Sequence, residues 1–431
     1  MKKSYLMIAA AATLLTACMG NDTFKEIANE DVMIGFETFH EKSTKATATD
    51  LIDGADDLTD ARGGFGVWGY KGSPASIKAY TGSNDMDLSQ TAKYTNVFNN
   101  IKVWYDATTS TSQNHAHFKY AVPKYWDKYA EYVFFAYAPF DGTNAVLTPS
   151  TGIITISDIA SIQDISDNNG QSGDDLVYTG IDASAATDYL IASCVNEQKY
   201  GSSPYTNQHE GTYSDAEQTV GFTFGHMLSK LSIKIQAFDK YNGVKEIKVD
   251  TLTITNMPAT SGTKAVFTQT SPNGTAGTYV PLAYTSKLKV IENGTVSGVS
   301  SGSSLYILKD GTAITDNGTG EITGANDPDD QPQQFNYFVA PNDPTQNTTP
   351  VHYILDLGYT TTYVDNISEH VCVNSVDLNS ILPKLEQNYY YILTIKIKMN
   401  EILFTVDAIT DWDPTNAGGV NNTTEQVVVI E

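Results

Sequence analysis

The sequence has almost no arginine and few positive charges of any kind. Of its 26 basic residues only Arg62 is an arginine, and 50 acidic residues bring the formal net charge to −24. A surface this acidic repels polyanions, so nucleic acids and anionic lipid surfaces are poor partners. The charge favours solubility and carries no information about the fold.

The chain also lacks long apolar runs and long stretches of helical periodicity. No segment after the N-terminal region approaches the run of about 18 apolar residues that a membrane-spanning helix needs. Tyrosine (26 residues) and glycine (32 residues) are abundant, which favours strands and turns. The length of 431 residues suggests two or three domains, and we choose two because all-β domains are often long. We therefore predict an all-β fold of two antiparallel β-sandwich domains in tandem.

Cysteine is scarce as well, with three residues in the chain. Cys194 and Cys372 each stand next to apolar residues of an expected strand. They could pair in an oxidising compartment, but the sequence cannot bring them within bonding distance. Two buried free thiols are the favoured interpretation, and a disulfide is the alternative.

The third cysteine belongs to the N-terminal region, which has the pattern of an export signal. Lysines follow Met1, Tyr5 to Leu15 is an apolar run of 11 residues, and small residues end at Cys18. This run is too short to span a bilayer, and charge, apolar core and small residues together indicate a signal peptide. A cysteine at the cut indicates a bacterial lipobox, so we expect residues 1–17 to be removed and Cys18 to carry lipid. An ordinary signal peptide with a chance cysteine is the alternative.

One isolated strand follows the signal. Val32, Ile34 and Phe36 lie on one face at strand period. A polar loop with Lys45 near its start and an acidic stretch over 50–61 separate this strand from the body. We predict a removable first strand within a lipidated tether and propeptide over 18–45.

The body of the chain contains strand patterns separated by polar turns. We place the border between an N-terminal domain, 46–215, and a C-terminal domain, 216–431, in the polar region 199–217, and positions from about 200 to 240 are open alternatives for it. Alternation predicts a strand over 231–236, and a shift of parity near Thr251 predicts a β-bulge in the strand over 246–254. The clearest other strands are expected at 63–70, 99–105, 115–120, 132–137, 153–156, 175–178, 334–339, 351–357, a hairpin of 388–399 with 402–409, and 425–431.

Three segments resemble one family, the fimbrillins or type V pilins. They are the aromatic block at 124–139, the Phe222-Thr223-Phe224-Gly225-His226-Met227-Leu228-Ser229-Lys230-Leu231 segment, and the closing hairpin from Asn388 to Trp412. The resemblance implies two transthyretin-like sandwiches, export as a lipoprotein precursor and removal of the first strand by a trypsin-like surface protease. It further implies that a strand of the next subunit fills the opened groove, as in β-strand addition. The candidate donor strand is Val427, Val428, Val429 and Ile430.

The expected cleavage site departs from the family pattern. The family's cut usually follows arginine in a Thr-Arg-Ala context, whereas this chain has Thr44-Lys45-Ala46. Its single arginine, Arg62, lies 17 residues later. Position favours Lys45 and residue type favours Arg62. Because residues 1–45 carry five positive and six negative charges, a cut after Lys45 leaves a chain of net charge −23.

No coherent active site is found, so no enzymatic activity, cofactor or metal is expected. Residues 298–302 match G-x-S-x-G but lack the strand and helix that the motif needs. Residues 167–170 fail the calcium-loop pattern because Ile165 and Leu176 occupy carboxylate positions. His115 and His117 form at most half of a metal site, and 327–330 reads as a solvated turn. His226 is expected to be a hydrogen-bonded core histidine.

We therefore predict a structural or adhesive pilus subunit at the outer membrane and cell surface. Its partners are other pilin subunits, the processing protease and the membrane through lipid on Cys18, with surface glycans or proteins as further candidates. The alternatives are a monomeric outer-membrane lipoprotein that binds glycans and an uncleaved anchor subunit at the pilus base. Stalk, tip and anchor roles are not distinguished by the sequence.

Overall fold

The computed structural model describes most of the body of the chain. The described residues are 33–40, 57–77, 86–106, 118–127, 129–160, 162–164, 187–199, 217–237, 243–259, 265–280, 283–292, 295–296, 305–309, 312–313, 334–341, 352–398, 401–410 and 424–429.

The described residues form strands and turns and contain no α-helix. The strands are β1 (Met33–His40), β2 (Phe65–Gly72), β3 (Tyr94–Tyr105), β4 (Phe118–Lys119), β5 (Glu131–Ala138), β6 (Ala145–Thr148), β7 (Ile153–Ile159), β8 (Ile162–Asp164), β9 (Leu190–Ala192), β10 (Val195–Lys199), β11 (Glu217–His226), β12 (Ser229–Ala237), β13 (Val244–Ala259), β14 (Ala265–Gln269), β15 (Gly277–Val280), β16 (Ala283–Glu292), β17 (Thr295–Val296), β18 (Leu305–Lys309), β19 (Thr312–Ala313), β20 (Gln334–Val339), β21 (Ile354–Tyr363), β22 (Ser368–Asp377), β23 (Tyr389–Ile397), β24 (Glu401–Thr410) and β25 (Thr424–Val429).

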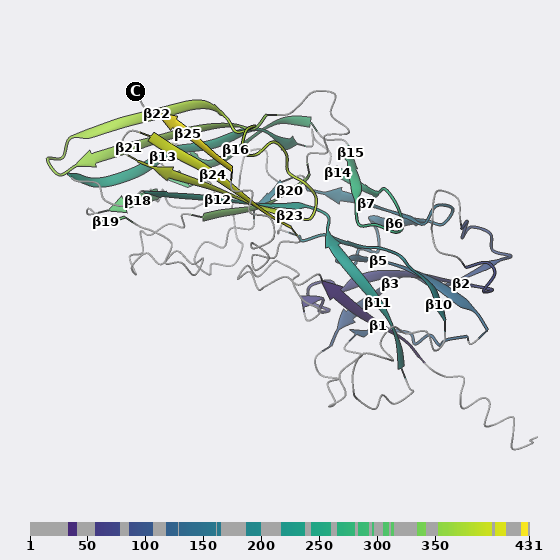
Figure 1. Ribbon diagram of the computed structural model, residues 1–431. Coiled ribbons are helices and arrows are strands. Elements are labelled where there is room, and N and C mark those ends of the chain that lie inside the picture. Colours follow the sequence, from purple (N-terminus) through teal and green to yellow (C-terminus); the bar gives the residue numbers. More distant parts are fainter. Residues whose placement is uncertain are drawn as a thin grey trace, which may run out of the picture.

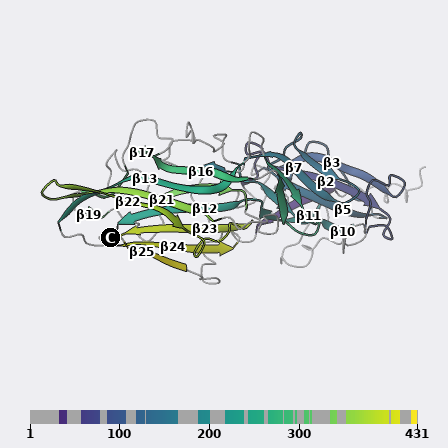
Figure 2. The same ribbon diagram turned by 90° about the horizontal axis from the view of Figure 1, so that it is seen from above.

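These strands make an elongated molecule of two lobes that lie end to end (Figure 1; Figure 2). One lobe contains a six-stranded sheet with the order β25-β24-β23-β12-β20-β8. It also contains a seven-stranded sheet that includes β13, β16, β18, β21 and β22. One hydrophobic core unites apolar side chains of both sheets, such as Ile233 and Leu393 from the first and Ile247 and Leu355 from the second. This is the arrangement of a β-sandwich.

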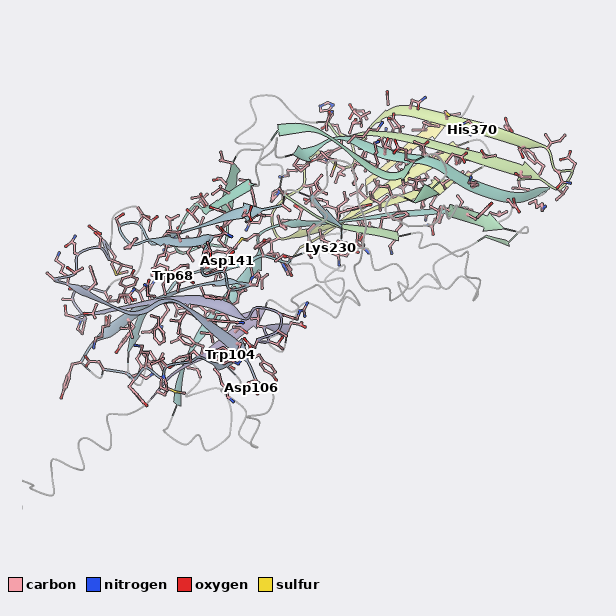
Figure 3. All side chains as sticks on the ribbon, turned by 180° about the vertical axis from the view of Figure 1, so that it is seen from behind. Trp68, Trp104, Asp106, Asp141, Lys230 and His370 are labelled. Carbon is pink, nitrogen blue, oxygen red and sulfur yellow. The ribbon has the colours of Figure 1, made fainter. Side chains whose placement is uncertain are left out.

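The other lobe is built on an eight-stranded sheet with the order β1-β11-β9-β5-β2-β3-β4 and β10 beside β5. A four-stranded sheet, β15-β14-β7-β6, shares a core with one face of it, where Trp68 and Phe135 meet Ile154 and Phe267. A second core, rich in phenylalanine, lies on the opposite face. Strand β5 is buried on both faces, as the continuous apolar pattern of 132–137 predicts. Trp68 and Trp104 mark this lobe in Figure 3, and His370 marks the other.

Strand pairing crosses the expected border between residues 215 and 216 in both directions. Strands β11 and β14 both follow residue 216 in the sequence. Yet β11 belongs to the eight-stranded sheet, and β14 pairs with β7, which precedes the border. In return, β8 pairs with β20 in the six-stranded sheet. Each lobe therefore contains strands from both sides of the expected border. A single border position in the sequence does not separate the two lobes. The division into two transthyretin-like domains stays a prediction.

Several local predictions are confirmed. The fold is all-β, and β23 and β24 form the expected antiparallel hairpin. The register of β13 against β21 shifts between Val249 and Thr251, which is the predicted bulge. His226 is buried, and its Nδ1 lies 2.9 Å from Oδ1 of the buried Asp188. No helix in the part of the chain described above is long and apolar enough to cross a membrane.

The two body cysteines are free thiols, but the prediction that both are buried is wrong. Cys194 is half-buried, whereas Cys372 is exposed on β22. The reason is strand parity: Val371 and Val373 pack against the core, so the residue between them must point to the other face.

Candidate strand-exchange site

The first strand, β1, occupies the end of the eight-stranded sheet. It pairs with β11 in parallel over its whole length, from Met33 opposite Glu217 to His40 opposite Phe224. A gap of more than 170 residues in sequence separates these partners. The described contacts of the strand are therefore with distant parts of the chain.

One face of β1 points into the phenylalanine-rich core. Ile34 and Phe36 are fully buried and Thr38 is nearly so, which is the parity that the sequence predicts for Ile34 and Phe36. Phe36 stacks on Phe222 with 6.0 Å between ring centroids. Its other aromatic neighbours, edge-on at 5.3 to 6.4 Å, are Phe65, Phe98, Tyr120 and Phe134. Such pairs stabilise a core by about 0.5–1.5 kcal/mol each beyond the area they bury.

The second edge of β1 contacts the segment after β4, at the far end of the same sheet. The backbone N–H of Ile34 donates to Lys124 O at 2.8 Å, and Met33 forms an antiparallel bridge with Tyr125. The Tyr120 hydroxyl donates to Ile34 O at 2.7 Å. The sheet therefore curls until its ends meet, and β1 is the strand that closes it around the aromatic core.

The segment that receives this second edge is anchored independently of β1. Trp126 is buried edge-on against Tyr132 at 4.9 Å, and the backbone N–H of Asp127 donates to the Tyr132 hydroxyl at 2.7 Å. The N–H of Tyr129 donates to Asp127 Oδ1 at 3.0 Å and Lys71 Nζ lies 3.0 Å from Oδ2. These bonds hold the pKa of Asp127 below its ordinary value. The segment that flanks β1 is thus held in place by contacts with the body of the protein that do not involve β1.

Arg62, one of the two predicted cleavage positions, lies in a compact turn. Its guanidinium pairs with Asp57, and Gly64 N donates to Thr59 O at 2.8 Å. Leu58, in the same turn, is fully buried in the core that holds Phe36, and its carbonyl accepts a hydrogen bond from Tyr105 N at 2.7 Å. The turn is therefore part of the folded body.

The predicted donor segment forms the last described strand. β25 pairs antiparallel with β24 at the edge of the six-stranded sheet (Figure 2). Val428 packs against the core, but Val427 and Val429 are 52% and 68% exposed. The structure thus pairs this segment within its own chain, and it presents two valines outward.

Cys18, Val32, Lys45 and Ile430 lie outside the described residues. So do His115, His117 and the segments 167–170, 298–302 and 327–330. Sequence reasoning missed Thr38, Leu58 and Tyr120. The alternation of Ile34 and Phe36 could have identified Thr38, two positions further on. No signal in the sequence identifies Leu58 or Tyr120, because their role depends on contacts with distant strands.

Metal chemistry is not indicated in the described ranges. No group of three or more histidine, cysteine, aspartate or glutamate side chains in them is placed to hold a metal ion. What the site offers is a strand-shaped position with a backbone ladder to β11 on one side, a backbone hydrogen bond to Lys124 on the other, and an aromatic floor.

The comparisons with known proteins concern the fold and the family. The structure resembles a fimbrial protein from Bacteroides vulgatus with a TM-score of 0.52 and 16% identity, over 88% of this chain and 99% of that one. At this identity the likeness supports the fold alone. Weaker similarity links it to a fimbrial assembly protein from Parabacteroides distasonis (TM-score 0.29, 9% identity, 93% and 98% of the two chains). It also links it to the tip fimbrial protein Mfa3 from Porphyromonas gingivalis (0.27, 10%, 88% and 99%).

A comparison with curated proteins gives no match. The sequence profile described as fimbrillin-like, however, matches residues 44–412. That range covers most of the chain and contains all three motifs noted in the sequence. The chain belongs to the fimbrillin-like family.

Proposed function

We propose that this chain is a subunit of a surface fimbria that polymerises by strand exchange. The precursor is exported as a lipoprotein through Cys18, a protease removes the first strand, and a strand from another subunit takes its place. The observation that carries the proposal is the position of β1, which closes a sheet around Phe36 although its partner strand β11 lies more than 170 residues away in the sequence.

The vacated position would suit an incoming strand because its surroundings are fixed by other bonds. Without β1, β11 would present a row of backbone donors and acceptors along one side. The anchored segment at 124–127 would form the other side, and five aromatic rings would form the floor. A preorganised groove binds a strand without a large ordering cost.

The donor in this proposal is the C-terminal strand. Two of its valines are exposed, and among the described strands it pairs with β24 alone. The 13 residues over 411–423 can span about 45 Å when extended, which lets the strand leave its sheet. β1 and β25 lie in different lobes (Figure 1), so exchange between copies would be head to tail and would build a filament.

We place the cleavage after Lys45 rather than after Arg62. A trypsin-like protease needs its substrate segment accessible and extended, whereas Arg62 is fixed in a hydrogen-bonded turn. A cut after Arg62 would also remove Leu58 from the core. The role is structural or adhesive, in keeping with a family that is generally not enzymatic.

The N-terminal sequence and intact mass of the protein recovered from the cell surface test the processing step. We expect a terminus at Ala46 for the wild type and for Arg62→Ala, and an unprocessed chain for Lys45→Ala. A terminus at Gly63 would contradict the choice of Lys45. A lipid-modified Cys18 terminus in the wild type would contradict removal of the first strand, and would favour the anchor subunit or the glycan-binding lipoprotein.

A further inference from the structure

Three strands of the seven-stranded sheet place a thiol, an imidazole and a carboxylate on one exposed face. β22, which holds His370 and Cys372, pairs with β21, and β21 pairs with β13. In the β21 register, Gly358 lies opposite both Cys372 and Thr251. Asp250 is therefore the extra residue of the β-bulge, and bulges re-aim side chains in this way. His370 lies in the lobe far from the strand-exchange site (Figure 3).

The three side chains form a row in which each lies within hydrogen-bonding distance of the next. Cys372 Sγ lies 3.1 Å from His370 Nε2, and His370 Nδ1 lies 3.1 Å from Asp250 Oδ2. Thr360 donates from its hydroxyl to the same carboxylate and so fixes its orientation. A nucleophile on one ring nitrogen and a carboxylate on the other is the arrangement by which an imidazole accepts a thiol proton.

This geometry does not fit a metal site. The two ring nitrogens of His370 point to opposite partners, so one ion cannot contact Cys372 and Asp250 through the same ring. Packing does not account for it either, because the histidine side chain is 54% exposed and the thiol is exposed beside it.

Cys194 provides an internal contrast in the same chain. Burial raises the pKa of its thiol to about 11, and its described neighbours are the amides of Asn273 and Asn196. A thiol in that state stays protonated near neutral pH and reacts slowly, because the thiolate is the nucleophile.

We propose that Cys372 is a nucleophilic thiol that undergoes exchange with small disulfides, with His370 as its base and Asp250 as a positioning residue. Exchange needs an accessible thiolate and no binding cleft, and an exposed strand face supplies that. The net charge of −24 disfavours anionic reagents, so the substrate class is small disulfides that are neutral or cationic.

The step balances without another reactant. His370 Nε2 takes the Cys372 proton, and Sγ attacks one sulfur of the disulfide R–S–S–R. The bond Sγ–S–R forms as the original S–S bond breaks, and the departing thiolate takes the bonding electron pair and then the proton from His370. The product is a mixed disulfide on Cys372 and one free thiol. The proposal does not depend on strand exchange.

The test uses the full-length chain and the cationic disulfide cystamine. Peptide mapping by mass spectrometry follows modification at Cys372 and Cys194 separately with time. We expect Cys372 to react at least about 10-fold faster than Cys194, and faster than Cys372 in the urea-unfolded chain. Equal rates at Cys372 in folded and unfolded protein would overturn the proposal.

Variants show whether His370 acts as the base for Cys372 or only supports the local structure. His370→Ala and Asp250→Asn should slow Cys372 about 10-fold, and the loss in His370→Ala should grow as the pH falls from 8 to 6. The charged groups on this face include Lys248 and Asp250 from β13, Asp356 from β21 and Lys287 from β16, which pairs with Asp356, and they remain in His370→Ala. A pH profile of His370→Ala that parallels the wild type would contradict the role of the base.

A matched control is available two residues before β21. His352 Nδ1 lies 2.7 Å from Asp377 Oδ2, so it is another exposed histidine paired with a carboxylate, and no hydrogen bond joins it to a thiol among the described contacts. His352→Ala should leave the Cys372 rate unchanged. If His352→Ala and His370→Ala slow the reaction equally, the effect comes from general charge or folding and the proposal fails.

Discussion

Phe36 lies at the centre of the aromatic core that the closed sheet surrounds. Its ring has five aromatic neighbours and no exposed surface. Replacing a buried phenylalanine by alanine costs about 3–5 kcal/mol, because transfer energy is lost and a cavity remains. We expect Phe36→Ala to lower the precursor's free energy of unfolding by that amount in urea denaturation. Val146→Ala on β6, where the side chain is 56% exposed, is the control and should change it by less than about 0.5 kcal/mol.

Tyr137 makes a second residue-scale prediction, on alkaline stability. Its buried hydroxyl donates to Asn100 Oδ1 at 2.8 Å and accepts from Asp141 N at 2.9 Å. Burial raises the pKa of Tyr137 to about 12. The folded pKa lies above the unfolded value of about 10, so the stabilisation is complete below pH 10 and is lost as the pH rises towards 12.

The comparison with Tyr137→Phe measures this loss. At pH 7 the wild type should be more stable by about 1–3 kcal/mol, because the variant leaves buried partners unsatisfied. Between pH 10 and 12 that difference should shrink, since the variant has no phenol at this position to ionise. Tyr129→Phe, at a 77% exposed position, is the control and should behave as the wild type. A difference that stays constant up to pH 12 would contradict the assignment.

At the scale of elements, β1 and β25 are held very differently. β1 is bonded to β11 along one whole edge and to Lys124 near the start of the other, and Ile34 and Phe36 on one face are fully buried. β25 is bonded along one edge, and only Val428 among its valines packs against the core. A strand of the second kind can leave its sheet at modest cost, whereas the departure of β1 would expose Ile34 and Phe36 to water and break its ladder with β11.

Deleting residues 424–431 should therefore leave a folded protein that cannot donate. We expect the thermal midpoint to fall by only a few degrees, because few apolar contacts are lost. In a mixture with intact processed subunits, the truncated chain should shorten the polymers in proportion to its share, which size-exclusion chromatography measures. Truncated chains that polymerise as well as intact ones would show that another segment is the donor.

Elements with strong local alternation could be predicted from the sequence. The hairpin of β23 and β24, the strand β12 and the bulge beside Asp250 all follow from side-chain parity over a few residues. The burial of Ile34 and Phe36 follows from the same rule. The partners could not be predicted, because parity fixes which face a strand buries and not which strand it pairs with. The pairing of β1 with β11, the exchange of β8 and β14 between lobes, and the closure of the sheet onto Lys124 all depend on distant segments.

At the scale of the whole molecule, the charge opposes assembly. A chain cut after Lys45 carries −23, from the 24 excess acidic residues less the one removed with residues 1–45. Two such subunits repel, and salt screens this repulsion because the Debye length falls from about 30 Å at 0.01 M to about 8 Å at 0.15 M. Polymerisation of processed subunits, followed by light scattering, should be several-fold faster at the higher ionic strength.

The matched control for the salt effect replaces one subunit by a short peptide. A synthetic peptide of residues 424–431 carries two acidic residues and no basic ones, so its binding to a processed subunit should depend much less on salt. If polymerisation slows as salt rises, attraction between opposite charges outweighs the net repulsion, and the expectation from net charge is wrong.

The elongated shape and the placement of β1 and β25 in different lobes give the molecule two unlike ends (Figure 1). The most direct test of strand exchange is electrophoresis, without heating, of purified protein from which residues 1–45 have been removed. If subunits exchange strands, the cut protein gives a ladder of SDS-resistant multimers that collapses to one band on boiling, and the uncut precursor remains a monomer. If the cut protein is folded but gives a single monomer band, strand exchange does not occur.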